Sequence, residues 1–132
     1  MKGIDTNILV RFLVGDDEQQ AQKVYTIFKN AERNKEELFV PLLVVLELMW
    51  VLESVYAIER KPIIEALREL LLMPILKFEH QSGLQHCLQA AQGTSFDLSD
   101  LLIAHAAQEQ GCETVITFDR KAARYSLFES AG

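Results

Sequence analysis

Residues 38–56 read LFVPLLVVLELMWVLESVY. The first three residues are an apolar run that Pro41 stops, which predicts a short buried strand at 38–40. Residues 42–56 are long enough for about four helical turns and are apolar on nearly every side. A buried strand followed directly by an apolar helix predicts an α/β fold.

The same alternation of strands and helices continues along the chain. Further strands are predicted at 2–4, 75–78 and 114–117, with a fifth opening at 127–128, and further helices at 8–13, 16–33, 62–72, 82–92 and 97–110, with a short one through Arg124. Pro62 suits a first helical turn, and Gly93 and Gly111 suit helix ends. This alternation predicts a parallel sheet of four or five strands with helices on both faces.

Length and composition limit the class of protein. The 132 residues fit a single domain, 1–132, and 49% of them are AVILMFWYC while 24% are charged, which is typical of a globular protein. No stretch has the roughly 20 uncharged apolar residues that span a bilayer, and the N-terminus lacks a signal-peptide pattern. We therefore expect a cytoplasmic protein that does not associate with a membrane.

The net charge of the chain is −6, from 13 Lys and Arg against 19 Asp and Glu. Nucleic-acid binding usually relies on a basic surface that neutralises phosphates, so this balance argues against a simple DNA- or RNA-binding module. It does not argue against a nuclease, because divalent cations held by carboxylates reverse the local sign of charge. The net charge therefore does not distinguish a binding module from a nuclease, and the residues of the candidate site are needed to do so.

Two aspartates follow predicted strands directly. Asp5 comes after the first strand and Asp119 after the fourth, and ligands of parallel sheets bind beyond the carboxyl ends of the strands. Each also has a structural explanation. Asp5 can cap the next helix, with Thr6 and Asn7 as alternative caps, and Asp119 can form a turn. Thr117 projects to the same side as Asp119 and could hydrogen-bond a neighbouring carboxylate or a metal-bound water.

Glu47 is the one charged residue in the eleven-residue run 42–52. A helix this apolar on all sides is expected to be mostly buried, and a buried carboxylate without a partner costs several kcal/mol. Glu47 should therefore be paired, protonated or bound to a metal. The structural alternative is an ion pair with Arg11 or Arg68; we favour a role as a ligand.

Asp97 and Asp100 lie at the start of the predicted helix 97–110. Asp97 is placed to cap that helix, and Asp100 falls in its first turn, where the helix dipole favours a negative charge. Asp100 begins the apolar face of the helix and should point near the sheet. Asp97 is therefore interpreted as a cap and Asp100 as a candidate ligand.

Together these residues offer oxygen donors without a thiol or imidazole pattern, since His80, His86 and His105 show no HExxH-like spacing. Hard oxygen donors suit Mg²⁺ or Mn²⁺ rather than zinc. Other classes are disfavoured: GxGxxG, GxxxxGK[ST] and GxSxG are absent. A receiver domain would need an aspartate at the end of the third strand, where this chain has Glu79.

Four segments carry a resemblance to a known family. They are GIDTNILVR at 3–11, VVLELMWVL at 44–52, FDLSDLLIA at 96–104 and TFDRKA at 117–122. In order and spacing, through nearly the whole chain, the sequence resembles the PIN-domain ribonucleases, and most closely the VapC toxins of bacterial and archaeal toxin–antitoxin pairs.

The resemblance implies a three-layer α/β/α sandwich around a parallel sheet, and Mg²⁺- or Mn²⁺-dependent endonuclease cleavage of RNA. By position, the family's acidic roles fall to Asp5, Glu47, Asp100 and Asp119, and supporting roles to Thr6, Asn7 and Thr117, with Asp97 as a helix cap or a residue beside the site. The resemblance also implies a VapB-like antitoxin as partner, and a homodimer.

One metal site built from these four acids is the expected active centre. Asp5, Asp100 and Asp119 would make most of the metal contacts, and Glu47 would bind a second ion or orient the attacking water. Single-stranded RNA is the expected substrate, because its backbone bends more easily into an acidic cleft. Basic side chains near the site could hold phosphates or be solvated surface charges; they are Arg11, Arg120, Lys121 and Arg124. The alternative is a non-catalytic PIN-fold interaction protein that retains the metal site.

Overall fold

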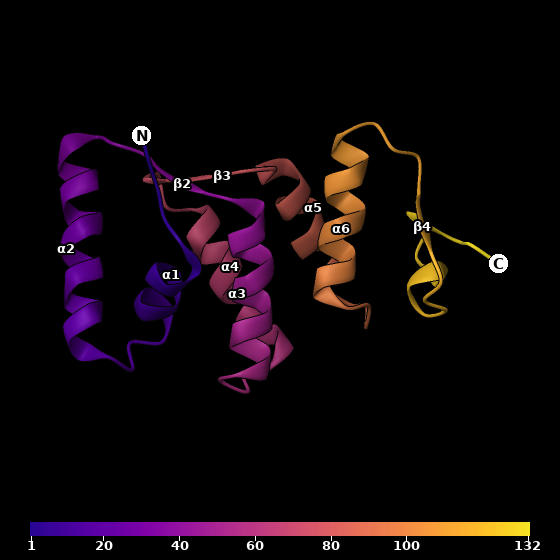
Figure 1. Cartoon of the computed structure of the whole chain (residues 1–132), viewed down its shortest axis with the longest axis horizontal. Helices are drawn as coiled ribbons and strands as arrows, with labels where there is room; N and C mark the ends of the chain where they lie inside the picture. The colour runs from indigo at the N-terminus through magenta and orange to yellow at the C-terminus, as the bar shows by residue number, and fades with distance from the viewer. The chain divides into compact units, whose positions relative to one another are not determined.

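Five short strands, six helices and one 3₁₀ turn alternate along residues 1–132 of the computed structural model (Figure 1). They divide into two compact units, Met1–Glu79 and His80–Gly132. Each unit has its own helices and its own parallel sheet, and each is described by itself. No helix in the chain is both long enough and apolar enough to cross a membrane.

The first unit has a three-stranded parallel sheet in the order β1-β2-β3. Its elements are β1 Lys2–Gly3, α1 Thr6–Leu13, α2 Glu18–Asn34, β2 Leu38–Val40, α3 Leu42–Ser54, α4 Arg60–Leu71 and β3 Leu76–Phe78. Leu38 of the central strand pairs with Lys2 on one side and with Leu76 on the other. Every connection between these strands contains helices, as parallel pairing requires.

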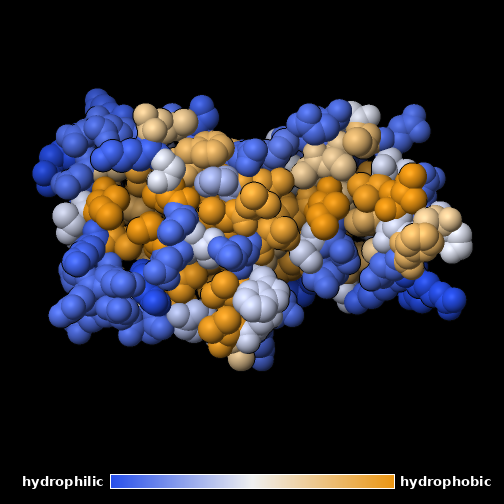
Figure 2. Space-filling model, in the orientation of Figure 1, coloured by the Kyte–Doolittle hydropathy of each residue, from blue (hydrophilic) through white to orange (hydrophobic).

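Helix α3 shows how the first unit forms its core. Val45, Leu48, Met49 and Leu52 recur at helical spacing and are buried, Leu48 completely. The opposite face is open to solvent, with Leu43 78% and Trp50 62% exposed. The expectation that this helix is mostly buried is therefore wrong, because only one stripe of it has neighbours to pack against. Hydrophobic side chains lie between hydrophilic ones over the helices of this unit (Figure 2).

Carboxylate side chains cap helices that the local sequence leaves uncapped. Pro41 precedes α3 and offers no side-chain cap, so a backbone N–H at the helix start needs another acceptor. Glu79, directly after β3, supplies it by accepting a hydrogen bond from Leu42 N at 2.7 Å. The end of β3 is thereby joined to the start of α3, the helix that follows the neighbouring strand β2.

The second unit is a helix pair packed beside a two-stranded sheet. Its elements are α5 Gln81–Ala91, α6 Leu98–Glu109, β4 Val115–Thr117, the 3₁₀ turn η1 Ala122–Arg124 and β5 Phe128–Ser130. The strands are parallel, with Val115 opposite Phe128. Ala104 of α6 packs with Ala122 and Phe128, so the helix and the sheet share one apolar cluster.

Helices α5 and α6 approach closely at Gly83. A Cβ atom there would come within 3.3 Å of the backbone oxygen of His105. The side chain of Glu109, at the end of α6, contacts the start of α5. Its Oε1 accepts from Gly83 N at 3.2 Å, and its Oε2 lies 2.7 Å from His80 Nδ1. Glu109 on one helix therefore caps the start of the other.

The predicted strands and helices are found at nearly their predicted bounds, and the α/β class with parallel strands is confirmed. The strands pair as three plus two, so a single sheet of four or five strands is not confirmed. No hydrogen-bonded ladder connects β4 or β5 to β1, β2 or β3.

Removing the Glu109 carboxylate should destabilise the second unit. Glu109→Ala leaves Gly83 N–H without its acceptor, and we expect a loss of about 1–2 kcal/mol in the free energy of unfolding by urea titration. Glu109→Gln keeps an acceptor and should lose less. Glu113→Ala, an exposed acid without a hydrogen bond, is the control. Equal stability of the Glu109→Ala and Glu113→Ala variants would contradict this role.

Candidate metal centre

Asp5 is the residue that joins β1 to α1. Its backbone is extended, with φ −97° and ψ 178°, and its Oδ1 accepts a hydrogen bond from Ile8 N at 3.3 Å. The capping role that the sequence allowed is therefore present. It occupies one carboxylate oxygen and leaves the other open on an exposed side chain, so capping and metal binding are compatible at this position.

Glu47 lies in the middle of α3 and is exposed, contrary to the prediction that it is buried. It forms no ion pair with Arg11 or Arg68; its Oε1 accepts a short hydrogen bond from the hydroxyl of Thr6. Thr6 itself is only 7% exposed and begins α1. This bond holds the Glu47 carboxylate beside Thr6, the residue that follows Asp5. Asn7, which follows Thr6, is exposed.

Arg11 is engaged within the first unit. Its Nη1 lies 2.6 Å from Asp16 Oδ1 and 3.3 Å from the hydroxyl of Tyr56, and its Nε donates to Gln20 at 2.6 Å. Tyr56 in turn donates to Asp16 Oδ2 at 2.9 Å. These bonds hold the turn between α1 and α2 against the end of α3. Arg11 is therefore a structural residue and not a free phosphate ligand.

The second unit carries the other acids. Asp97 stands at the N-cap position of α6, but its side chain does not cap the helix and accepts only from Ser99 Oγ, at 3.4 Å. Asp100, in the first turn, is partly buried. Burial raises the pKa of Asp100, and the nearby charges of Asp97 and Asp119 raise it further, whereas Lys121 opposes them. A cation bound near Asp100 would offset the like charges that act on this carboxylate.

Asp119 is fixed by the turn that follows β4. Its Oδ1 accepts from Ala122 N at 2.9 Å, and its backbone N–H donates to Thr117 Oγ1 at 3.0 Å. The predicted turn-forming role is thus present, and Thr117 binds the backbone of this turn rather than a neighbouring carboxylate. The second carboxylate oxygen of Asp119 stays open, as it does in Asp5.

Two tethers that sequence reasoning did not find hold the Asp119 turn to α6. Lys121 Nζ donates to Ser95 O at 2.6 Å, just before the helix. The hydroxyl of Tyr125 lies 2.7 Å from Nε2 of His105, which is buried in α6. Burial lowers the pKa of His105. Nothing in the local sequence signals either contact, since each joins residues at least twenty positions apart.

The structure therefore places the predicted acids in two sets, Asp5 with Glu47 in the first unit, and Asp97, Asp100 and Asp119 in the second. Neither unit by itself gathers three or more His, Cys, Asp or Glu side chains into a group that could hold a metal ion. The donors present are carboxylate oxygens with open lone pairs, which suit a hard divalent cation.

The order of these acids along the chain agrees with a known family. The family profile of the PIN domain matches residues 3–127, and the chain belongs to this family. Among curated proteins it is similar to a VapC ribonuclease of Aquifex aeolicus (strain VF5). The two are 28% identical over 121 residues, which cover 92% of this chain and 89% of that protein.

The hydrogen bond from Tyr56 to Asp16 makes the stability of the first unit depend on pH. It is the largest cause of a lowered pKa of Asp16, ahead of the charge of Arg11. Because the folded-state pKa is lowered, ionised Asp16 stabilises the fold above about pH 4, and this is lost as the pH falls through the folded-state pKa. In Tyr56→Phe the pKa of Asp16 should rise toward its ordinary value.

Carboxyl ¹³C NMR titration of Asp16 measures that shift directly. Tyr25→Phe is the matched control, because Tyr25 is 55% exposed and its hydroxyl makes no hydrogen bond. An unchanged titration of Asp16 in Tyr56→Phe would show that the tyrosine does not hold this carboxylate.

Proposed function

We propose that the protein is a metal-dependent endoribonuclease that cleaves single-stranded RNA, with Asp5, Glu47, Asp100 and Asp119 as its catalytic carboxylates. The observation that carries the proposal is the PIN-domain match over residues 3–127, within which the four acids stand at the ends of strands and on flanking helices. The name of the Aquifex aeolicus relative, VapC ribonuclease, supports RNA cleavage.

The proposed cofactor is Mg²⁺ or Mn²⁺. Asp5, Asp100 and Asp119 would hold it through the carboxylate oxygens that no hydrogen bond occupies, and Glu47 would hold a second ion or orient the attacking water. When bound, such an ion offsets the repulsion between carboxylates and activates a water for attack on a phosphodiester. The raised pKa of Asp100, caused first by burial and then by the charges of Asp97 and Asp119, supports a cation near Asp100.

Hydrogen bonds to the acids supply the orientation that a metal ligand needs. Ile8 N–H holds Asp5, the Thr6 hydroxyl holds Glu47, and Ala122 N–H holds Asp119. Each bond restricts the carboxylate and leaves an oxygen for another partner. We assign a supporting role on this basis to Thr6. Thr117, which accepts from the backbone N–H of Asp119, would support the turn that carries this acid, and Asn7 and Asp97 are assigned supporting roles by family position.

Two arginines are the proposed contacts to RNA phosphates. Arg120 and Arg124 are exposed beside the Asp119 turn and form no ion pair, whereas Arg11 and Lys121 are engaged within the protein. Arg120 and Arg124 can therefore meet a phosphate without breaking an existing contact. A flexible single strand can bring its phosphates to two arginine side chains more easily than a rigid duplex can.

The wider proposal follows the VapC relative. The chain would act as one PIN domain over residues 1–132, a three-layer α/β/α sandwich in the cytoplasm, and as the toxin of a pair whose VapB-like antitoxin restrains it. A homodimer is part of the same proposal. The exposed side chains of α3, Leu43 and Trp50, are available to such a partner.

Cleavage of a fluorescent single-stranded RNA tests the activity. Asp5→Asn, Glu47→Gln and Asp100→Asn should each lower the Mn²⁺-supported rate on the order of 100-fold or more, and a chelator should abolish the wild-type rate. Glu53→Gln, an exposed acid on the same helix as Glu47, should keep full activity. Full activity of Asp5→Asn and Asp100→Asn, with intact circular dichroism, would refute the assignment. No cleavage by the wild type in any metal would favour the non-catalytic alternative.

A further inference from the structure

A polar pair in the second unit joins the Asp119 turn to α6. The hydroxyl of Tyr125 lies 2.7 Å from Nε2 of His105, and the contact is partly buried. Burial lowers the pKa of His105 and raises the pKa of Tyr125, so both side chains are uncharged near neutral pH. The contact is therefore a neutral hydrogen bond, which requires a defined distance and direction between its two partners.

Stability alone does not explain this pair. His105 is only 9% exposed, and its other ring nitrogen, Nδ1, is buried without a hydrogen-bond partner. A buried polar atom without a partner destabilises a fold, whereas two apolar side chains of similar shape would avoid that cost. The ring of Phe96 lies 5.2 Å from that of Tyr125, so an apolar neighbour is already present. A polar pair in this position indicates a requirement other than stability.

Tyr125 and Asp119 belong to one hydrogen-bonded turn. The N–H of Ala122 donates to Asp119 Oδ1 at 2.9 Å, and the carbonyl oxygen of Ala122 accepts from Tyr125 N at 2.9 Å. The backbone oxygen of Asp119 accepts from Ala123 N at 3.0 Å. Ala122 is thus bonded both to the proposed metal ligand and to Tyr125. A displacement of Tyr125 would therefore reach the Asp119 carboxylate through short bonds.

His105 and Asp100 belong to the same helix, α6. Five positions separate them, which is about 7.5 Å along the axis of a straight helix. The helix fixes Asp100 relative to His105, just as the turn fixes Asp119 relative to Tyr125. The hydrogen bond between Tyr125 and His105 therefore closes a continuous path from one proposed ligand to the other. Burial raises the pKa of Asp100, and the charge of Asp119 contributes to the same shift, so the two carboxylates lie near each other.

The other tether of this turn is more adaptable. Lys121 Nζ donates to Ser95 O at 2.6 Å, and this bond is exposed. A lysine side chain has a flexible four-carbon stem, so it can keep such a bond while the turn moves. The aromatic ring of Tyr125 has no comparable freedom. The partly buried pair is therefore the contact that fixes the turn on α6.

We propose that Tyr125, through its hydrogen bond to His105, is a positioning residue that holds Asp119 where it can share a divalent cation with Asp100. Metal ligands must be held within about 0.5 Å of their productive geometry. A directional hydrogen bond provides this restraint, whereas the hydrophobic effect is non-directional. The inference rests on the proposed function, because it concerns two of the proposed metal ligands.

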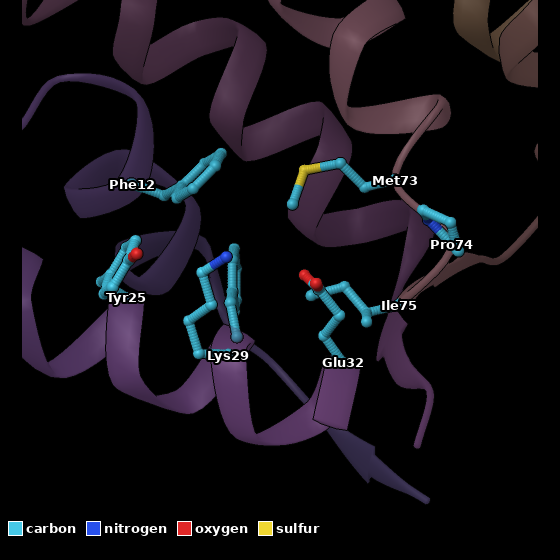
Figure 3. Close-up of a pocket in the computed structure, with 8 residues that line it drawn as sticks. Phe12, Tyr25, Lys29, Glu32, Met73, Pro74 and Ile75 are labelled. Carbon is cyan, nitrogen blue, oxygen red and sulfur yellow. The ribbon is translucent and has the colours of Figure 1, made fainter. Parts of the chain in front are cut away.

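Mn²⁺ binding by the 132-residue chain without RNA, measured by calorimetry, tests this role. Tyr125→Phe keeps the ring and removes the hydroxyl, and it should weaken Mn²⁺ binding on the order of tenfold. Tyr25→Phe is the matched control. Tyr25 lines a groove of the first unit and its hydroxyl makes no hydrogen bond, so this variant should bind Mn²⁺ as the wild type does (Figure 3).

Two further variants separate positioning from loss of stability. His105→Leu combined with Tyr125→Phe replaces both polar partners by apolar ones, so the midpoint of urea unfolding should equal or exceed that of the wild type. Mn²⁺ binding should still be weakened. Glu109→Ala destabilises the same unit at the other end of α6 and should keep the wild-type Mn²⁺ affinity. If the pair had only a structural role, Mn²⁺ affinity would follow the unfolding midpoint in both variants.

A positioning residue has no effect once the residue that it positions is lost. Asp119→Asn should weaken Mn²⁺ binding at least as much as Tyr125→Phe does, and adding Tyr125→Phe to it should cause no further loss. In RNA cleavage, Tyr125→Phe should raise the Mn²⁺ concentration that gives half the maximal rate and leave KM for RNA unchanged.

The outcomes distinguish this inference from the proposed function. Wild-type Mn²⁺ affinity in Tyr125→Phe, alongside a loss in Asp119→Asn, would overturn the inference and leave the proposed metal site standing. A further loss when Tyr125→Phe is added to Asp119→Asn would also overturn it, because the tyrosine would then act elsewhere. Unchanged affinity in Asp119→Asn itself would refute the proposed ligand, and the inference with it.

Discussion

The backbone N–H groups at the start of a helical segment need acceptors, and for α1, α3 and η1 acidic side chains just past strand ends provide them. Asp5 follows β1 and accepts from Ile8, Glu79 follows β3 and accepts from Leu42, and Asp119 closely follows β4 and accepts from Ala122. Parallel strands bring such positions to the carboxyl edge of a sheet. The need to cap helices thereby fixes acidic side chains where a ligand would bind.

Much of this arrangement could be predicted from the sequence. Hydrophobic periodicity located the strands and helices, and strand ends marked Asp5 and Asp119. The exposure of Glu47 could not be predicted, because an all-apolar helix does not reveal which face lacks a neighbour. The contact of Arg11 with Tyr56 could not be predicted, because the two residues are 45 positions apart, whereas Asp16 is only five positions from Arg11. Pairing of the strands as three plus two also depends on contacts that periodicity does not encode.

Negative charge has a direct use in the proposed metal site. Burial raises the pKa of Asp100, and the charges of Asp97 and Asp119 raise it further. Lys121 opposes these effects in part, and its ammonium group also donates to Ser95 O. A hard cation bound near Asp100 would offset the like charges and make an acidic chain competent to act on a polyanion.

The proposed function requires Asp5 and Asp100 each to contribute to divalent-cation binding, and calorimetry with Mn²⁺ measures both contributions. Wild type, Asp5→Asn, Asp100→Asn and the double variant form a double-mutant cycle. If both acids hold the same ion, each single change should weaken Mn²⁺ binding at least tenfold, and the double variant should lose less than the sum of the two free energies. Unchanged Mn²⁺ affinity in Asp5→Asn alongside a loss in Asp100→Asn would contradict a shared site.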